Sequence, residues 1–578
     1  MNYKLIAPRD DELTAIEQVL VNRGIPYKDI RLYLNLNDSV IQDPYGLTNI
    51  ELGARRLLQA MLRQEEIYVQ VDSDCDGYTS AAVLINYLHR VFPSIVENKV
   101  RYGLHTKKHH GIAVEDIPGG CTLVVAPDSS SNEADIHREL KANGIDVLVL
   151  DHHHAEPDGQ DPAIIINNQM CDYDNKCLSG VGVVYKFCKV LDDLIGVSYA
   201  DDSLDLVALG MVADMMDLRS FETKRLIDIG CAEIHNPFFV HMARKNDYSM
   251  KSKINPFTIS FYVAPFINAI TRSGSDAEKL LIFESLLDHR AMRLIPSGNR
   301  NRKGLEDLLV VEAIRVAGNV KKHQDDAKVK ALDDLRFRIN SGECDFGILI
   351  ITLDNPIDTN LTGLLANQIM AEYGKPTLIL NKRVNNETGE ITWEGSGRGF
   401  ITPHVNDWRA YLEQYAMYAE GHAMAFGVGF TPDQLTGFKH LMTTSPMDIT
   451  KSYDVDFVFQ MTDNFDADIL DIAKYDEMWG QGLTQPMVAI KNISLKKDDI
   501  LLQGKGTLKL KLGNHRTTCI KFGGTDIYNE LQSLFPSDDA TIKLNLIGTC
   551  SLNDWGGSIS PQLKLVDYDV SYVDTWGF

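Results

Sequence analysis

The sequence has no long hydrophobic run. No window approaches the roughly 20 consecutive apolar residues that a membrane-spanning helix needs. The N-terminal segment MNYKLIAPRDDELTAIEQVL also lacks the apolar stretch of a signal peptide. We therefore expect a cytoplasmic protein that does not enter a membrane.

Paired cysteines are also absent. Nine cysteines are scattered from Cys75 to Cys550, and none belongs to a CxxC pair. An odd, dispersed set is typical of reduced, buried thiols and not of a disulfide framework. Cys171 and Cys177 are the closest pair, and a zinc site there is the disfavoured alternative.

Positive charge is scarce. The chain has 57 Lys and Arg residues against 80 Asp and Glu, which gives a formal net charge of −23. Phosphate binding usually leaves a basic footprint, so this total argues against a nucleic-acid partner. The argument is weak, however, because carboxylates can hold cations and a local groove can be basic on an acidic protein.

The length predicts several domains, since 578 residues are too many for one core. Hydrophobic residues make up 44% and charged residues 24%, as in an ordinary globular protein, and we find no low-complexity run or internal repeat. The expected order is an N-terminal helical cap (1–64), a parallel-sheet α/β domain (65–300), a connecting helix (301–344), a second α/β domain (345–445) and a small β-barrel domain (446–578).

These expectations rest on hydrophobic periodicity. The apolar segments IYVQV, TLVVA, IDVLVL and AIIIN alternate with helical patterns such as SAAVLINYLHRVF, which predicts a parallel, doubly wound sheet. A polar helical pattern without proline follows at about 300–340, and α/β alternation then resumes. After Pro446 nearly every apolar segment has β character, as in a small barrel.

Carboxylates and histidines follow three of the predicted strands. The segment DSDCDG follows IYVQV, Asp128 follows TLVVA, and Asp151-His152-His153-His154 follows VLVL. In open α/β sheets ligands bind at the carboxyl ends of the strands, so these side chains should converge. Histidines beside a carboxylate suggest metal ligands.

Structural or calcium-binding roles are the alternatives for these residues. DSDCDG resembles an EF-hand calcium loop, but Val83 stands where that loop needs Glu, and a strand precedes it. Asp128 or Asp214, taken alone, could be an ordinary helix cap. Their combination favours one functional cleft.

The order DSDCDG, APD, DHH and VAD at these spacings resembles motifs I to IV of the DHH phosphoesterases. The segments LSGVGVVYKF and FYVAPFINAITRSG resemble elements of the RecJ family of single-strand-specific exonucleases. EGSGRGF and EGHAMAFGVGF resemble the two signatures of the associated DHHA1 domain. The likeness spans roughly residues 65–570, although EGH replaces the usual two glycines before histidine and SSS follows Asp128 where glycine is common.

The resemblance implies two divalent ions, Mn²⁺ or Mg²⁺, with Asp128 bridging them. It implies the metal ligands Asp72, Asp74, Asp76, Asp128, His152 and Asp214. His153 would contact the scissile phosphate, and a catalytic role is expected for it and for every ligand except Asp72. Two ions about 4 Å apart can activate water and stabilise both oxygens of a phosphodiester displacement. His154 is either structural or supports the ligands.

Nucleic-acid contacts are expected in three places: Asn268 and Arg272 along the strand path, Ser396, Arg398 and His422 in the DHHA1 signatures, and Lys505, Lys509, Lys511 and Arg516 on an OB-type barrel of five strands. Trp479 and Trp555 are either stacking platforms or core residues. The alternatives are a glycine-rich turn with a solvated Arg398 and a merely soluble strand face.

The resemblance implies metal-dependent 5′→3′ hydrolysis of single-stranded DNA by a monomer. Residue spacing does not show polarity or distinguish DNA from RNA, and it leaves single-strand-binding or replication proteins open as partners. A nanoRNase or cyclic-dinucleotide phosphodiesterase is the alternative enzyme. A non-catalytic DHH-like replication scaffold would have eroded ligands, whereas every ligand is present here.

Overall fold

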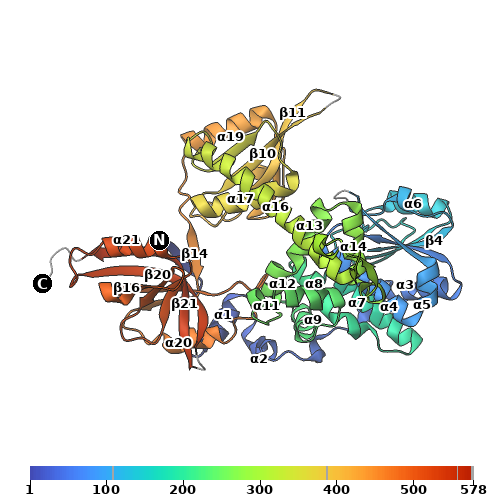
Figure 1. Cartoon of the computed structure of the whole chain (residues 1–578), viewed down its shortest axis with the longest axis horizontal. Coiled ribbons are helices and arrows are strands. Elements are labelled where there is room, and N and C mark those ends of the chain that lie inside the picture. The colour runs from blue at the N-terminus through green and yellow to red at the C-terminus, as the bar shows by residue number, and fades with distance from the viewer. Residues whose placement is uncertain (107–109, 386–387, 556–557, 574–578) are drawn as a thin grey trace. The chain divides into compact units, whose positions relative to one another are not determined.

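The computed structural model describes residues 1–106, 110–385, 388–555 and 558–573 (Figure 1). The chain divides into two compact units. One contains residues 23–322 and 477–485, and the other contains residues 1–22, 323–476 and 486–578. Among the described residues, no helix combines the length and apolar character needed to cross a membrane.

A five-stranded sheet in the order β3-β2-β4-β5-β6 forms the centre of the first unit, and every neighbouring pair is parallel. This confirms the parallel sheet expected from the sequence. The edge strand β3 was not predicted, because its residues are mostly only half-buried and form no apolar run. The strands are β2 (Glu66–Val71), β3 (Val100–Leu104), β4 (Cys121–Pro127), β5 (Asp146–Asp151) and β6 (Ile164–Asn167).

Three helices that carry or support site residues pack against one another in this unit. They are α4 (Cys75–Val91), α7 (Gly180–Ile195) and α8 (Leu204–Ala213). The sequence LDLVALGMVA is apolar on nearly all sides, which explains why every residue of α8 except the last, Ala213, is buried. The cluster of buried helices therefore fixes the side chains at their ends.

Shorter helices complete the first unit, together with a hairpin of β7 (Leu294–Pro296) and β8 (Glu306–Leu308). The helices are α2 (Ile30–Tyr33), α3 (Ile50–Leu62), α5 (Pro93–Lys99), α6 (Ala134–Ala142), α9 (Phe221–Ala232), α10 (Pro237–Lys245), α11 (Asp247–Met250), α12 (Pro256–Tyr262), α13 (Ala264–Ser273), α14 (Asp276–Leu286) and α15 (Asp288–Ala291). The long helix expected from the polar pattern is α16 (Leu309–Asn340).

The second unit begins its α/β part with a five-stranded mixed sheet in the order β12-β13-β11-β10-β9. Trp408, Phe430 and Phe438 fill the core on one of its sides. The elements are β9 (Leu349–Leu353), α17 (Thr359–Tyr373), β10 (Thr377–Val384), β11 (Ile391–Arg398), α18 (Trp408–Glu413), β12 (Tyr418–His422), β13 (Ala425–Phe430) and α19 (Pro432–Thr444).

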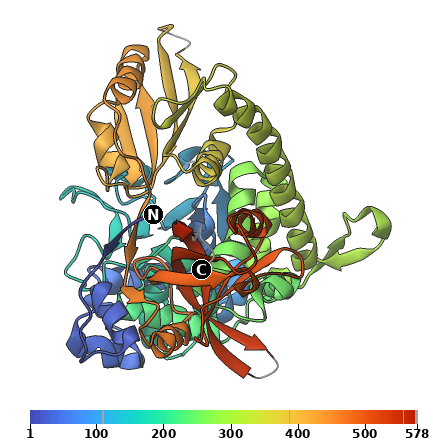
Figure 2. The same ribbon diagram turned by 90° about the vertical axis from the view of Figure 1, so that its left-hand side faces the viewer.

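The C-terminal part, drawn in orange to red in Figure 2, contains a sheet. The sheet has seven strands, two more than expected, in the order β15-β16-β20-β21-β19-β18-β17. These are β15 (Phe457–Gln460), β16 (Met487–Lys496), β17 (Ile500–Gln503), β18 (Thr507–Lys511), β19 (Thr518–Lys521), β20 (Thr541–Trp555) and β21 (Ser558–Val573). Helices α20 (Asp466–Ala473) and α21 (Thr525–Ser533) accompany them.

The first residues of the chain form a strand where the sequence analysis expected helix. β1 (Asn2–Leu5) pairs in parallel with β14 (Ser452–Val455), and α1 (Ala15–Asn22) follows. Four residues are too few to show a hydrophobic period, and the pairing partner lies about 450 positions away in the chain. Where the five expected domains begin and end stays a prediction.

Candidate metal-dependent active site

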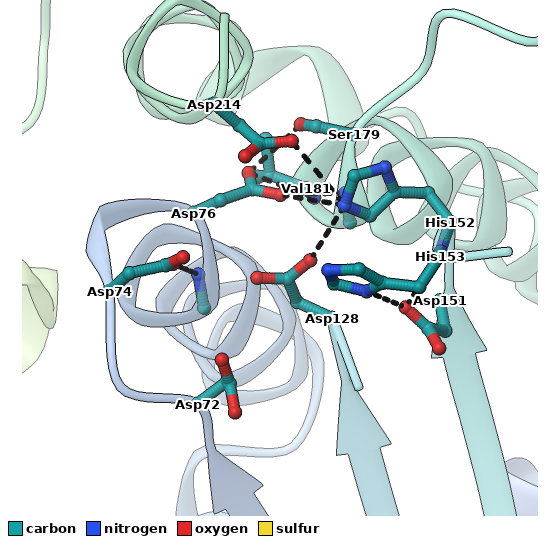
Figure 3. Close-up of polar contacts among 12 residues, drawn as sticks. Asp72, Asp74, Asp76, Asp128, Asp151, His152, His153, Ser179, Val181 and Asp214 are labelled. Atoms are coloured by element: carbon teal, nitrogen blue, oxygen red, sulfur yellow. Dashed lines mark hydrogen bonds and ion pairs between the residues drawn. The ribbon is translucent and has the colours of Figure 1, made fainter. Parts of the chain in front are cut away.

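The six expected metal ligands converge at the carboxyl edge of the parallel sheet (Figure 3). They come from the end of β2 and the start of α4, from the residue after β4, from the residue after β5 and from the end of α8. The elements and residues are β2 with Asp72, α4 with Asp74 and Asp76, β4 with Asp128, β5 with His152, and α8 with Asp214. Parallel strands bring their carboxyl ends to one edge, as the sequence analysis assumed.

The six expected ligands make up two of the three candidate metal groups found among the described residues. Asp72, Asp74 and Asp128 make one, and Asp76, His152 and Asp214 make the other; within each, the ligand atoms lie within 4.8 Å of one another. Asp128 joins them, because its Oδ1 lies 3.2 Å from His152 Nε2. His152 Nε2 also lies 3.4 Å from Asp214 Oδ2 and 4.0 Å from Asp76 Oδ2. This grouping fits two adjacent ions.

Several of these buried atoms make no hydrogen bond within the described structure. Asp72 Oδ1, Asp128 Oδ1 and His152 Nε2 are all in this state. Burying a carboxylate oxygen or ring nitrogen without a partner is costly. Divalent cations held by the two groups would satisfy all three, so the residues fit the metal ions that the sequence implied.

Burial and mutual repulsion shift the pKa values of the clustered carboxyl groups. Burial, with neighbouring carboxylates, raises the pKa of Asp76 to about 6 and of Asp214 to about 8, and it raises the pKa of Asp128 well above its usual range. Burial also lowers the pKa of His152 to about 4. His152 is therefore a neutral imidazole, the form that binds metal.

His153 has the opposite character. Its Nδ1 lies 2.8 Å from Asp151 Oδ1, and this hydrogen bond raises the pKa of His153 to about 9. The side chain is 54% exposed, so a protonated ring faces the solvent beside the carboxylate cluster. Such a cation suits a phosphate contact, although its ring also lies near enough to Asp128 and His152 to join a metal group.

His154 lies outside this arrangement. Its side chain is exposed, and its backbone carbonyl accepts a hydrogen bond from Asn132. The ring belongs to none of the candidate metal groups among the described residues. These observations favour a structural role over support of a ligand.

The start of α7 supports the cluster, which the sequence analysis did not predict. Asp76 accepts hydrogen bonds from the Ser179 hydroxyl at 2.9 Å and from the backbone N–H of Gly180 at 2.7 Å and of Val181 at 3.3 Å. A Cβ on Gly180 would collide with Asp128. The glycines of LSGVGV were the available signal for this close approach.

His110 is a second unpredicted neighbour, since its Nδ1 lies 2.6 Å from Asp72 Oδ2. The adjoining backbone is fixed by the side chains of Glu133 and Gln70. Glu133 accepts from the N–H of Ile112 at 2.9 Å, and Gln70 accepts from the N–H of Ala113 at 3.1 Å. No sequence pattern signals this contact, because it depends on the path of a loop.

The expected strand-path residues Asn268 and Arg272 lie on α13, which packs against α4 and α8. Arg272 is exposed, while Asn268 is half-buried and its Oδ1 has no hydrogen-bond partner within the described structure. The helix that bears both residues therefore adjoins the helices that carry Asp76 and Asp214. Their contact with nucleic acid stays a prediction.

The expected phosphate contacts of the second unit share one sheet. Arg398 on β11 and His422 on β12 both stand opposite Ala425 of β13, so the three residues form a row on one face. Ser396 Oγ lies 2.8 Å from Thr362 Oγ1. Burial lowers the pKa of Arg398. The row could grip an anion, but its role stays a prediction.

The basic residues expected on the C-terminal sheet are gathered around β18. Lys509 and Lys511 alternate with buried Leu508 and Leu510, so they share the outer face. Lys505 lies in the turn before β18 and is exposed, as is Arg516 in the loop after it. Their contact with nucleic acid also stays a prediction.

Two remaining expectations concern tryptophans and cysteines. Trp479 is only 7% exposed and lies in the first unit, so it is a core residue and not a stacking platform. The side chain of Trp555 lies outside the part of the chain that the structure describes. All nine cysteines are free thiols, and Cys171 and Cys177 join none of the metal groups found among described residues.

Comparisons with known proteins show which proteins this chain is similar to. The model of the DHH family, N-terminal domain, matches residues 66–211, and that of the RecJ OB domain matches residues 455–567. The putative SPbeta prophage-derived single-strand DNA-specific exonuclease YorK of Bacillus subtilis is 30% identical, over 99% of this chain and 98% of that protein.

More distant relatives support the same assignment. The single-stranded-DNA-specific exonuclease RecJ of Bacillus subtilis is 23% identical over 99% of this chain and 71% of its own length. The crystal structure of Thermus thermophilus RecJ in complex with Mn²⁺ matches with a TM-score of 0.68 at 18% identity, covering 96% of this chain and 76% of that one. The chain therefore belongs to the RecJ family of DHH-domain exonucleases.

Proposed function

We propose that this protein hydrolyses phosphodiester bonds of single-stranded DNA from the 5′ end at two divalent ions, manganese or magnesium. The observation that carries the proposal is the pair of largely buried ligand groups that the contact between Asp128 and His152 joins, beside a protonated His153. The choice of single-stranded DNA follows the relatives' names, and the polarity follows the RecJ likeness.

The chain's own residues divide the work. Asp72, Asp74 and Asp128 would hold one ion, and Asp76, His152 and Asp214 would hold the other, next to Asp128. When bound, such a pair of ions supplies Lewis-acid stabilisation and an activated water. Ser179 and the start of α7 keep Asp76 oriented.

His153 would act on the substrate. The Asp151 carboxylate holds its Nδ1, so the rest of the ring is oriented and positively charged. A fixed cation next to the cluster can bind a phosphate oxygen and stabilise charge that develops there in the transition state. The metal-free cluster itself offers the substrate no positive charge, because its ligands are carboxyl groups and a neutral imidazole.

The wider setting belongs to the same proposal. We expect a cytoplasmic monomer whose basic face on β18 binds the strand away from the cleavage site. Manganese should serve at least as well as magnesium, since the ligands combine oxygen with imidazole. RNA remains an alternative substrate, and single-strand-binding or replication proteins remain open as partners.

Labelled oligonucleotides test the proposal. DNA and RNA oligomers carrying a label at the 5′ or the 3′ end are incubated with manganese, with magnesium and with chelator. We expect 5′-labelled DNA to release its label first, only with metal, and not with Asp74→Ala or Asp214→Ala. Retention of a tenth of the manganese-dependent rate by either variant would remove that residue from the site.

Two alternatives have their own outcomes in this experiment. Faster cleavage of a dinucleotide than of the long strand would favour a nanoRNase or cyclic-dinucleotide phosphodiesterase. Absence of hydrolysis with every metal and substrate would favour a non-catalytic scaffold. The intact ligand set argues against the scaffold, because such a set normally serves catalysis.

A further inference from the structure

Three aromatic side chains on two neighbouring helices of the first unit are exposed to solvent. Phe257 and Phe261 stand one turn apart on α12, with ring centroids 4.6 Å apart, and are 55% and 60% exposed. Tyr248 on the neighbouring helix α11 is 97% exposed. Single exposed rings, such as Tyr27 and Phe337, also occur elsewhere on this protein, but adjoining exposed rings on two neighbouring helices suggest an interaction surface.

Basic residues outnumber acidic ones in the segment that carries this aromatic face, defined as Tyr248, Phe257 and Phe261, although one of the basic residues, Lys253, is ion-paired with Glu477. Between residues 241 and 262 the chain has four basic residues and one acidic residue, although its formal net charge is −23. Arg244 and Lys253 also line a hollow of about 340 Å³ beside α11. A polyanion therefore fits this surface better than a neutral or acidic partner.

The aromatic face is linked to the candidate active site through neighbouring segments. A Cβ on Gly480 would lie 2.6 Å from Leu218 and 3.6 Å from Pro256, so these two residues are close to each other. Pro256 begins α12, and Leu218 follows the ligand Asp214 by four positions. The next helix, α13, packs against α4 and α8, which bear metal ligands.

Exposed rings with basic neighbours are the features that single-stranded nucleic acid requires. Unpaired bases offer apolar faces that stack on aromatic side chains, whatever the base, while Lys and Arg follow the phosphates. A duplex hides those faces within its own stack. The combination therefore also selects for single strands, which an apolar or basic surface alone would not do.

We propose that Tyr248, Phe257 and Phe261 form a stacking platform for the bases of a single strand that leads to the metal centre. Arg244 and Lys251 border the platform and contact the phosphate backbone. The inference deepens the proposed function and rests on it. It assigns strand selection in part to the first unit, separately from the basic face on β18.

Substitution of the two phenylalanines tests the platform. The double variant Phe257→Leu/Phe261→Leu keeps an apolar surface but removes the rings, whereas Phe257→Trp/Phe261→Trp keeps them. Binding of a fluorescein-labelled oligothymidylate is measured by anisotropy, with chelator present so that nothing is cleaved. We expect the leucine variant to bind about tenfold more weakly, and the tryptophan variant to bind normally with quenched indole fluorescence.

An abasic oligonucleotide is the control. It retains the phosphates and loses the bases, so wild type and leucine variant should bind it equally. An equal loss on the abasic strand would overturn base stacking and indicate a change in fold or charge. Full affinity of the leucine variant for oligothymidylate, or conversion of a wild-type dimer into a monomer by the leucines, would also overturn the platform.

The platform and the proposed function fail separately. If the leucine variant binds oligothymidylate normally while the wild type cleaves long DNA with manganese, the platform is wrong and the function stands. If the wild type cleaves nothing but the leucines still weaken binding, the function is wrong and the platform stands.

Discussion

Two adjacent histidines show how burial decides chemistry at the scale of one residue. His152 is buried among carboxylates and stays neutral, with a pKa lowered to about 4. His153 is hydrogen-bonded to Asp151, and its pKa rises to about 9. The same imidazole group therefore serves as a ligand in one position and as a cation in the next.

The two roles predict different losses. His152→Ala should remove bound manganese, because it deletes a ligand, whereas His153→Ala should retain manganese and lower turnover at least tenfold. Metal content by elemental analysis and single-turnover rates distinguish them. If His153→Ala loses manganese as completely as His152→Ala, its ring is a ligand and the phosphate role is misassigned.

His110 supports a ligand, and its two ring nitrogens can be tested separately. Its Nδ1 bonds Asp72 Oδ2, while Asp72 Oδ1 is left without a hydrogen bond within the described structure. His110→Ala should weaken manganese binding about tenfold or more, as removal of such a partner usually does. His110→Asn keeps a nitrogen near Nδ1 and should restore binding, whereas His110→Gln should not. Calorimetric titration with manganese measures this, and equal losses in all three would contradict it.

Residues could be predicted where a motif follows a strand, and not where a contact depends on a loop or on burial. The ligands Asp72, Asp128 and His152 follow predicted strands, and the sheet brings them together. His110 lies in a loop, so its sequence neighbours give no sign of its partner. Trp479 left two roles open, and only its burial decided between them.

At the scale of elements, helix starts supply the hydrogen-bond donors that the cluster needs. Ser179 stands at the N-cap of α7, yet its hydroxyl donates to Asp76 and caps no N–H of the helix. The backbone N–H of Gly180, which lies at the helix start and has no partner within the helix, also donates to Asp76. These bonds favour the ionised carboxylate, although burial outweighs them and leaves its pKa raised.

Gly180 allows this close approach, which predicts a local effect of substitution. Gly180→Ala should displace Asp128 and abolish binding of two manganese ions, with little change in melting temperature. Gly182→Ala is the matched control on the same helix, because its Cβ would approach only Leu178, at 3.2 Å. Normal manganese binding by Gly180→Ala, measured by titration, would show that Asp128 can move without loss.

The elements were predictable to the extent that their hydrophobic periods are long. The four strands with continuous apolar runs, and α16 with its polar helical pattern, agree with the structure. β3 is a half-buried edge strand, and β1 depends on pairing with β14, so neither has a local signal. Tertiary pairing decides such short segments.

At the scale of the whole molecule, the crowded carboxyl groups make the stability of the fold depend on pH and on bound metal. Without metal, the pKa of Asp214 is raised to about 8, so the folded state keeps a proton that the unfolded chain has lost. The raised pKa of His153 acts in the same direction. Stability should therefore be highest at the acidic end of the interval from about pH 6.5 to 8.5 and fall as pH rises.

This prediction is checked by thermal melting in chelator. The loss from one proton is at most about 1.4 kcal/mol per pH unit across that interval. Bound manganese should remove this fall in stability with pH, because its positive charge balances the carboxylates. Asp214→Asn should make the slope of melting temperature against pH in chelator shallower. A melting temperature that is independent of pH in chelator, or unaffected by manganese, would show that the carboxylate cluster does not lower the stability of the metal-free protein.

The distribution of positive charge gives the last prediction. Lys505, Lys509, Lys511 and Arg516 are gathered around β18 on a chain with a net charge of −23. Removing the entire C-terminal region would also strip β1 of its partner β14, so point substitutions are the cleaner test. We expect the quadruple change to Gln to weaken binding of a long oligonucleotide and to leave dinucleotide cleavage unchanged, because the metal ligands are retained.

Salt dependence identifies the cause of that loss. Each phosphate contact on a single strand contributes about 0.7 to the slope of log affinity against log salt, so loss of four contacts should reduce the slope by up to about 3. A control that changes Lys321, Lys322, Lys328 and Lys330 of α16 to Gln alters the net charge equally. If both variants reduce the slope by the same amount, total charge is responsible and not the face on β18. If neither reduces it, the strand is held elsewhere, and the aromatic face on α11 and α12 becomes the principal binding surface.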